Sequence, residues 1–375
     1  MGNGFSIIMG STLAYLVHDL GDAAVARRVE GLRAGGAQVE IAGFYRRAAP
    51  ANVAGAPALP LGRSHDAKLA QRAWLVLRTL LAPGRLKTLV RRSDIVVARN
   101  LEMLAIGAGL VRPGQTLVYE CLDIHRKLLG EGLASRALRL IERRLLKRTA
   151  RVIVSSPAFE RDYFRGLQQW QGPVDLIENK VSAVPCTPPS IGIEGGPRTI
   201  GWFGMLRCRR SLEILSTLAA RADGRVRVLV AGIPSPDVFA DLPAEIARHP
   251  GMEYVGPYRA TDLLRLYGRV QFAWCIDYFE EGLNSRWLLP NRLYESLAHG
   301  VVPVALADVE TGRWLEQAGV GLRLAQGEAL GKALEGLTPE RHAALSEAAR
   351  ALPRGRIAFF PDDHRSLVRQ LETAS

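Results

Sequence analysis

Short apolar runs alternate along the first half of the chain with longer segments whose apolar residues follow a helical period. The runs predict buried strands at Leu13–Val17, Val39–Gly43, Ile95–Ala98, Leu117–Cys121 and Val152–Ser155. Helices are predicted between them at Ala23–Ala34, Ala67–Leu81, Leu101–Gly109 and Ala134–Thr149. Because each helix lies between two strands, as a crossover between parallel strands requires, the pattern predicts an α/β fold with parallel sheets.

The alternation restarts after residues 185–197, a segment rich in proline and glycine that is typical of a linker. The second half predicts strands Thr199–Phe203, Val226–Ala231, Glu253–Val255, Val270–Ile276 and Val302–Ala305, and helices Ser211–Arg221, Ala260–Tyr267, Asn291–His299, Thr311–Ala318 and Asp362–Thr373. We therefore expect domains at 1–184 and 198–355, a tail helix within 356–375, and a cleft between the two domains. Ligands of open α/β sheets bind at the carboxyl ends of the strands.

Composition excludes several classes of protein. Of the 375 residues, 48% are hydrophobic and 23% are charged, as in a folded soluble protein. The four cysteines (Cys121, Cys186, Cys208 and Cys275) are far apart, which argues against a zinc ribbon or a disulfide framework and suits a reducing cytoplasm. The apolar start at Phe5–Val17 has no basic residue before it, so a buried first strand is a better interpretation than a signal peptide. We expect a cytoplasmic protein.

The net charge of +12 is confined to one half of the chain. Residues 1–185 hold 27 Lys and Arg against 15 Asp and Glu, whereas residues 186–375 hold 22 of each kind. Within the first half, Arg63–Arg92 has eight basic residues and one acid, interleaved with Trp74, Leu77 and Leu81. A core-facing helix with a solvated basic face would show this composition too, but the uneven charge favours an anionic membrane surface as partner.

A candidate phosphate site follows the first strand of the second half, in Gly201–Ser211. Gly204 would let a phosphate approach the backbone, the next helix offers free N–H groups, and Arg207 with two further arginines adds positive charge. The alternative is a plain strand-to-helix turn with a solvated basic corner. No GxGxxG or GxxxxGK sequence occurs, which excludes the usual dinucleotide and P-loop motifs.

A second candidate lies in the helix 291–299. Asn291 suits an N-cap and Gly300 suits the position after the helix. Arg292, Glu295, Ser296 and His299 share one helix face by their spacing. A carboxylate there can accept two ribose hydroxyls and the arginine can reach a phosphate, although Arg292 and Glu295 could equally form a surface ion pair.

Six stretches, in order, resemble the GT-B glycosyltransferases that include family GT4. Residues 290–304 (PNRLYESLAHGVVPV) resemble the signature PNKLYEYMAAGKPVV, and the GWFGMLR loop resembles the family's GyvGrl phosphate loop. The other four are Ala23–Val39, Leu117–Asp123, Ile141–Glu160 and Leu176–Val181, which resemble the first helix with its GHEV turn, vvyelHD, lErrllrradrvitvSe and viPNgv. The resemblance covers most of both predicted domains.

The resemblance implies two Rossmann-like domains facing each other across a cleft, in a hexosyl- or glycuronosyltransferase. It makes Glu295 the ribose ligand of a nucleotide-diphosphate sugar, with UDP-sugars favoured, and gives the phosphates to Gly204, Arg207 and Arg292. Asn291 would be a further donor-binding residue. It implies no metal and no cofactor. The acceptor would be a polyprenyl-diphosphate-linked saccharide of bacterial exopolysaccharide synthesis, at the inner face of the plasma membrane.

Catalysis would fall to the first domain, where Asp123, His125 and Asp22 are the candidates. A carboxylate at a strand end can act as general base in an inverting transfer. Asp123 could instead cap the following segment, and Asp22 is the better candidate for a cap, of helix 23–34. Trp287 stands where retaining members often have the first glutamate of an EX7E pair, and Leu122 replaces the histidine of HD. The stereochemistry therefore stays open.

Two other classes of function remain as alternatives. One is a nucleotide-sugar epimerase on the same fold. The other is a basic nucleic-acid-binding protein, which the sequence pI of about 9.9 allows. No recognised nucleic-acid motif is present, and apart from Trp74 the aromatic residues are not interleaved with the basic runs, so we expect no nucleic-acid partner.

Overall fold

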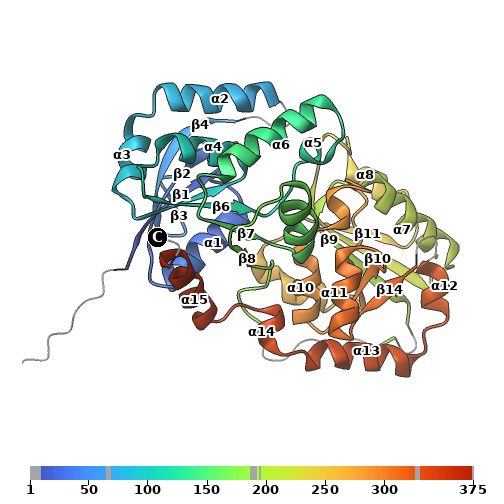
Figure 1. Cartoon of the computed structure of the whole chain (residues 1–375). Helices are drawn as coiled ribbons and strands as arrows, with labels where there is room; N and C mark the ends of the chain where they lie inside the picture. Colours follow the sequence, from blue (N-terminus) through green and yellow to red (C-terminus); the bar gives the residue numbers. More distant parts are fainter. Residues whose placement is uncertain (1–9, 65–68, 186–191, 194–195, 326–329, 374–375) are drawn as a thin grey trace, which may run out of the picture. The chain divides into compact units, whose positions relative to one another are not determined.

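The computed structural model describes residues 10–64, 69–185, 192–193, 196–325 and 330–373, which divide into two compact units (Figure 1). Unit 1 holds the described parts of Met1–Ser155, Phe159–Ile177 and Phe360–Ser375, and unit 2 holds those of Ser156–Ala158 and Glu178–Phe359. Each unit contains a sheet of parallel strands, which confirms the predicted α/β class. Most of the predicted linker 185–197, with Cys186, and the start of Phe5–Val17 lie outside the described residues.

Unit 1 is built on an eight-stranded sheet in the order β3-β4-β2-β1-β5-β6-β7-β8. Only the β3–β4 pair is antiparallel. The strands are β1 (Thr12–Val17), β2 (Gln38–Tyr45), β3 (Asn52–Val53), β4 (Ala56–Arg63), β5 (Ile95–Arg99), β6 (Thr116–Cys121), β7 (Arg151–Val154) and β8 (Val174–Leu176). The order of the strands reverses between β1 and β5, so the carboxyl ends of these two strands mark the expected ligand crevice.

Helices cover both faces of this sheet. They are α1 (Ala23–Ala34), α2 (Leu69–Leu81), α3 (Gly84–Arg92), α4 (Leu101–Leu110), α5 (Arg126–Leu129), α6 (Leu133–Leu146), the π-helix η1 (Phe159–Leu167) and α15 (Pro361–Glu372). The predicted tail helix is therefore real, and it packs against α1 of unit 1. A Cβ atom on Gly35, the C-cap of α1, would lie 2.3 Å from the carbonyl oxygen of His364, so this close helix contact requires a glycine.

The central strands follow the prediction, but four outer strands were missed. These are β3, β4, β8 and, in unit 2, β14 (Leu322–Leu324), all at or next to a sheet edge. β4 contains Pro57 and Pro60, which would be out of place in a central strand. Edge strands are only partly buried, so they lack the continuous apolar run that marks a central strand.

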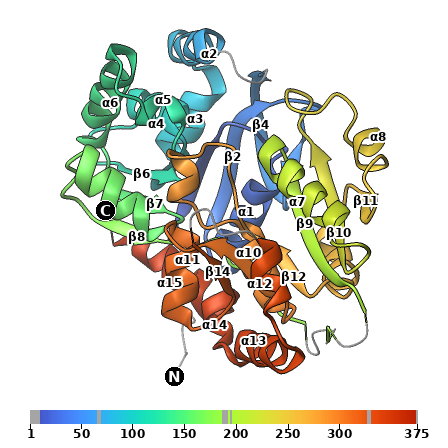
Figure 2. The same cartoon turned by 90° about the vertical axis from the view of Figure 1, so that its right-hand side faces the viewer.

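Unit 2 carries a six-stranded, wholly parallel sheet in the order β11-β10-β9-β12-β13-β14. Its other strands are β9 (Arg198–Leu206), β10 (Val226–Pro234), β11 (Met252–Gly256), β12 (Phe272–Trp274) and β13 (Val302–Leu306). The helices are α7 (Arg209–Arg221), α8 (Leu242–Ile246), η2 (Ala260–Asp262), α9 (Leu263–Tyr267), η3 (Asn284–Arg286), α10 (Asn291–Ala298), α11 (Glu310–Ala318), α12 (Leu330–Glu335), α13 (Pro339–Ala351) and α14 (Arg354–Ile357). Figure 2 shows α7 beside β9 and β10.

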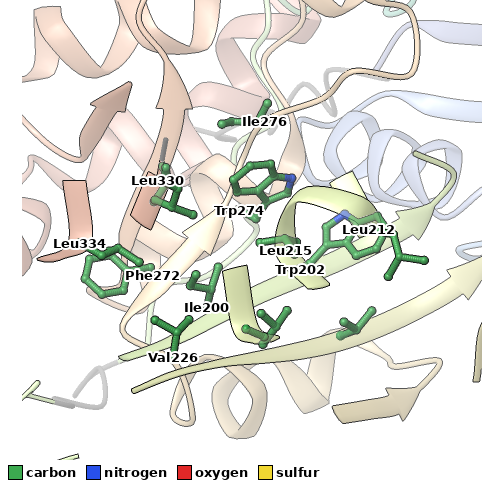
Figure 3. Packing of buried hydrophobic residues seen from close by; sticks show 14 of the residues in the cluster. Ile200, Trp202, Leu212, Leu215, Val226, Phe272, Trp274, Ile276, Leu330 and Leu334 are labelled. Atoms are coloured by element: carbon green, nitrogen blue, oxygen red, sulfur yellow. The ribbon is translucent and has the colours of Figure 1, made fainter. Parts of the chain in front are cut away.

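Two apolar layers hold unit 2 together, one on each face of its sheet. On one face Trp202 of β9 and Trp274 of β12 pack with Leu212 and Leu215 of α7 (Figure 3). On the other face the helices α9, α10 and α11 cover the sheet, with Leu293 fully buried. Burying each such side chain contributes about 1.5–3 kcal/mol. The reversal of strand order between β9 and β12 puts the expected ligand crevice at their carboxyl ends.

A buried carboxylate ties together the middle of unit 1. Glu120 at the end of β6 has no exposed surface, and it accepts hydrogen bonds from Tyr15 Oη and, at 2.6 Å, from Arg28 Nε. Arg99 Nη1 lies 3.8 Å from the same carboxylate. Burial alone would raise the pKa of Glu120, but Arg28, Arg99 and these hydrogen bonds outweigh it and leave the pKa below its ordinary value.

We predict that Glu120→Gln destabilises unit 1 by about 3–5 kcal/mol, because the half-buried Arg28 and the buried Arg99 both lose the charge of Glu120. Since the pKa of Glu120 is lower in the folded state, its stabilisation is complete above the unfolded value of about 4.3 and is lost as the pH falls through the folded value. Hydrogen exchange of the β1 and β6 amides measures the loss.

Glu40→Gln is the matched control, since Glu40 forms an exposed ion pair with Arg92 in the same unit. Such a pair contributes about 1 kcal/mol or less. Equal protection of β1 and β6 in the two variants would contradict a structural role for the buried carboxylate.

Candidate functional site

The glycine-rich segment of unit 2 is strand rather than loop. β9 continues through Gly204 to Leu206, and the predicted loop shrinks to Arg207 and Cys208 before α7 begins. Gly204 has a φ of +119°, and a Cβ on Gly232 of the neighbouring β10 would lie 1.8 Å from the Gly204 carbonyl oxygen. Among the described residues, and leaving out its two chain neighbours, no atom lies within 4 Å of the place where a Cβ of Gly204 itself would be. A ligand can therefore approach this backbone closely.

The three arginines after β9 differ in how firmly they are held. Arg209 and Arg210 form short ion pairs with Glu245 and Glu281, and their guanidinium groups also stack on the rings of Phe239 and Tyr278. Arg207 has only a long ion pair, 3.9 Å from its Nη2 to Asp277 Oδ2, and it lies 4.5 Å over the ring of Phe279. Arg207 is thus the most available of the three for a bound anion.

The helix α10 places Arg292 at the same edge of the sheet. Arg292 Nη2 donates to the carbonyl oxygen of Ile276 at 3.3 Å, and Arg292 Nε is buried with no hydrogen-bond partner in the described part of the chain. Ile276 precedes Asp277, the partner of Arg207. The segment after β12 therefore brings two guanidinium groups to the carboxyl ends of β9 and β12.

The ends of α10 differ in part from the prediction. The N-cap is Pro290, and Asn291 is the exposed first residue of the helix, so the cap assigned to Asn291 is wrong. A proline N-cap has no side-chain acceptor, which leaves the first N–H groups of α10 without that partner. Gly300 follows the helix with a φ of +68°, as predicted.

Glu295 is half-buried and accepts a hydrogen bond from Tyr267 Oη at 3.3 Å. Burial raises the pKa of Tyr267 well above its ordinary value, and the charge of Glu295 adds to the shift, so the phenol remains a donor. The ring of His299 stacks on Tyr267 at 4.9 Å, and its Nδ1 lies 2.7 Å from the carbonyl oxygen of Glu295. Tyr267 and His299 thus hold Glu295 in place.

The predicted helix face divides by environment. Arg292 and Glu295 are half-buried, whereas Ser296 and His299 are buried. Ser296 Oγ donates to the carbonyl oxygen of Leu293. Of the four residues, Arg292 contacts the segment after β12 through Ile276, and Glu295 contacts Tyr267 of α9.

In unit 1, Asp22 is the N-cap of α1, as expected, with its Oδ1 accepting from the backbone N–H of Ala24 at 2.8 Å. Its Oδ2 lies 3.6 Å from Nη2 of Arg99, the arginine that also approaches Glu120. The Asp22 carboxylate is therefore already engaged on both oxygens.

His125 and Asp123 follow β6. His125 is the N-cap of α5, with Nδ1 accepting from the backbone N–H of Lys127 at 3.2 Å. The alternative that Asp123 caps this segment is therefore wrong, and Asp123 is exposed. Burial lowers the pKa of His125 below its ordinary value, and Arg72 adds to the shift, so the ring is neutral near pH 7.

Several residues at or near the carboxyl edges of the two sheets were not predicted from the sequence, among them Glu120, Arg99, Tyr267 and Asp277. Glu120 carried a readable signal, since it is a charged residue in the otherwise apolar run Leu117–Cys121. Charged residues are almost never fully buried without a partner, so that run implied a buried ion pair. Tyr267 and Asp277 carried no comparable signal, because their contacts come from distant segments.

The described residues contain neither a membrane-spanning helix nor a cluster of metal ligands. Among the helices they form, none is both long and apolar enough to traverse a lipid bilayer. No three His, Cys, Asp or Glu side chains in these ranges come together in a way that could hold a metal ion.

Comparisons with known proteins agree on one family. Residues 22–180 match the family described as "Glycosyl transferase 4-like domain". The succinoglycan biosynthesis protein ExoL of Rhizobium meliloti (strain 1021) is 42% identical over 375 residues, which cover 96% of this chain and 93% of ExoL.

Solved structures show the same fold at low sequence identity. Sucrose-phosphate synthase from Thermosynechococcus elongatus has a TM-score of 0.74 at 16% identity, covering 97% of this chain and 100% of that one. Anabaena HepE in complex with UDP and glucose has a TM-score of 0.69 at 15% identity, covering 97% and 100%. WaaG, a glycosyltransferase involved in lipopolysaccharide biosynthesis, has a TM-score of 0.65 at 16% identity, covering 95% and 99%.

Proposed function

The chain belongs to the glycosyl transferase 4-like family of GT-B glycosyltransferases, and we propose that it transfers a hexose-type sugar from a UDP-sugar to a lipid-linked saccharide in bacterial exopolysaccharide biosynthesis. The name of the relative ExoL, similar along nearly the whole chain, supports a role in making succinoglycan or a related polymer. Neither alternative raised from the sequence, an epimerase or a nucleic-acid-binding protein, gains support from this membership.

The observation that carries the donor site is the pair of arginines at the carboxyl ends of β9 and β12. Arg207 and Arg292 would bind the diphosphate, with Gly204 allowing its approach and Asn291 at the start of α10 nearby. Glu295, oriented by Tyr267, would accept the ribose hydroxyls. The UDP complex of HepE, a protein of the same fold, favours uridine as the base.

These arginines would also balance the charge of the leaving diphosphate, so the proposal needs neither a metal nor another cofactor. Charge-assisted hydrogen bonds from guanidinium to phosphate are about twice as strong as neutral ones. Such bonds lower the barrier when they strengthen as the sugar–phosphate bond breaks.

The acceptor would bind unit 1, where Asp123 is the preferred general base. Asp22 caps α1 and pairs with Arg99, and His125 caps α5, so both candidates already have structural roles. Asp123 is exposed at the end of β6. An inverting transfer would use its carboxylate to take the proton of the acceptor hydroxyl.

We propose that unit 1 docks on the anionic inner face of the plasma membrane, where a polyprenyl-diphosphate-linked acceptor would lie. Trp74, Leu77 and Leu81 recur along α2 and expose 55%, 55% and 76% of their surface. Leu133 of α6 exposes 83%. The guanidinium group of Arg78 lies 5.4 Å over the Trp74 ring, so cationic and apolar groups share this surface. Apolar side chains would enter the acyl boundary and cations would face the headgroups.

The donor site predicts a defined response to nucleotides. A ligand that binds only the native state at 100 times its dissociation constant adds about 2.7 kcal/mol to the free energy of unfolding. Among UDP, GDP, dTDP and ADP, UDP should therefore raise the melting temperature most if it binds most tightly. Arg207→Ala should cost about 1.5–3 kcal/mol of UDP binding, and Glu295→Ala should also weaken it. Calorimetric titration with UDP gives the affinities.

Glu253→Ala is the control, because Glu253 forms an exposed ion pair with Arg269 in the same unit. It should bind UDP as the wild type does. Unchanged affinity in Glu295→Ala for every one of these nucleotides would remove Glu295 from the site.

The proposed role of Asp123 as general base predicts a defect in turnover that is separate from UDP binding. Asp123→Asn should lower turnover by about 10²–10⁴-fold and leave UDP affinity intact, since the amide cannot accept the proton. Steady-state transfer assays with UDP-glucose and a lipid-linked acceptor measure it. Turnover within a few-fold of wild type would exclude Asp123 and leave Asp22 as the next candidate.

Membrane docking predicts binding to vesicles that depends on charge and salt. Each Lys or Arg near an anionic surface contributes about 1 kcal/mol, and the attraction fades within a Debye length of about 10 Å at 0.1 M salt. Reversing Arg78, Arg85 and Arg91 to Glu should therefore abolish co-sedimentation with phosphatidylglycerol vesicles and spare UDP binding.

The control reverses three exposed arginines of unit 2, Arg221, Arg248 and Arg341, which changes the net charge equally. It should still sediment. Wild-type protein that stays in the supernatant at low salt would refute the membrane proposal.

A further inference from the structure

A small pocket lies at the carboxyl edge of the sheet in unit 1. His18 follows β1, and Phe44 and Arg46 stand at and just after the end of β2. The pocket is also lined by Arg72 and Leu75 of α2 and by Glu102 of α4. Its volume is about 30 Å³ and it is partly open. A space of this size admits one polar group such as a hydroxyl, since a water needs about 10–15 Å³ by the same measure.

The two arginines of the pocket already have carboxylate partners. Arg46 Nε lies 3.1 Å from Asp19 Oδ2, and Arg72 Nη1 lies 3.1 Å from Glu102 Oε1. The positive charges in and around the pocket are thus balanced by negative ones. A balanced lining offers little net attraction to a phosphate, but its donors and acceptors suit an uncharged polar ligand.

His18 supplies the unsatisfied group. Its Nδ1 is buried and has no hydrogen-bond partner among the residues that the structure describes. Burial lowers the pKa of His18 below its ordinary value, and the positive charge of Arg99 adds to the shift, so the ring is neutral near pH 7. In a neutral imidazole, Nδ1 is either a donor or an acceptor. A hydroxyl group can both donate and accept, so it satisfies either tautomer.

Apart from Ser64, the remaining lining residues are apolar: Phe44, Leu75 and Met103. Phe44 and Leu75 are buried beside the polar groups, exposing 4% and 6% of their surface. A sugar presents this combination, with C–H groups on its ring faces and hydroxyls at its edge. A few convergent polar groups in an apolar setting are also the usual makeup of a small-molecule site.

We propose that this pocket is a subsite for the terminal sugar of the acceptor, and that His18 binds one hydroxyl group of that sugar. The inference rests on the proposed function, because it takes a saccharide as the acceptor. The pocket is close to the candidate base: the Arg72–Glu102 ion pair that lines it also acts on His125, two residues from Asp123.

Saturation-transfer NMR on the full chain tests the proposal with methyl β-D-glucopyranoside and methyl β-D-galactopyranoside as probes. The wild type should transfer saturation to at least one of them. His18→Leu keeps an apolar filling but removes the hydrogen bond, so the signal should fall at least fivefold. His18→Asn keeps an amide near the position of Nδ1 and should restore most of it. His249→Asn, a partly buried histidine of unit 2, should behave as wild type.

Three outcomes would overturn the subsite. The first is no transfer to either glycoside, and the second is undiminished transfer in His18→Leu. The third is displacement of the glycoside by millimolar inorganic phosphate, which would identify an anion site instead. The UDP thermal shift, measured on each variant, keeps the two proposals apart. UDP binding without glycoside binding refutes the subsite alone. A wild-type protein that binds no UDP refutes the proposed function.

Discussion

A carboxylate buried without any contact with water, that of Glu120, constrains the whole carboxyl edge of unit 1. Such a charge is tolerated only with close partners, and Tyr15, Arg28 and Arg99 provide them from β1, α1 and β5. Arg99 then reaches Asp22, the cap of α1. The ends of three strands and the start of a helix are thereby fixed relative to one another. The candidate acceptor residues are attached to this frame.

The two units use their arginines differently. In unit 1, Arg28, Arg46 and Arg72 have carboxylates at 2.6, 3.1 and 3.1 Å. Arg99 is farther from its carboxylates, at 3.6 and 3.8 Å, but it is buried and also donates to Tyr15 Oη at 3.2 Å. In unit 2, Arg207 has a carboxylate only at 3.9 Å and rests on an aromatic ring. Paired guanidinium groups orient hydroxyls, whereas a loosely held one can turn to a phosphate. The basic excess of unit 1 accordingly belongs to exposed helices such as α2 and α3 rather than to its pocket.

The sequence predicted what depends on local pattern. Central strands are buried on both faces, so their apolar runs were readable, while β4 with its two prolines was not. The importance of Glu295 followed from motif resemblance, but its support by Tyr267 comes from another helix and could not be read locally. The sequence alone does not distinguish the three arginines after β9. Only the positions of Glu245 and Glu281 in space show that two of them are already engaged.

The chain enters unit 2 after Ile177 and returns to unit 1 at Phe360, so the last helix of unit 1 is formed by the end of the chain. The segment that enters unit 2 after Ile177 and the one that leaves it before Phe360 are hydrogen-bonded to each other. Val181 donates to the carbonyl oxygen of Ile357 at 3.0 Å, and Phe359 donates to that of Val181 at 2.9 Å. Since both bonds lie within unit 2, these two connections leave it at one place, and the short segment Ser156–Ala158 accounts for the other crossings between the units. The chain then returns to unit 1 as α15, so unit 1 completes its helical layer over α1 only after unit 2 has been traversed.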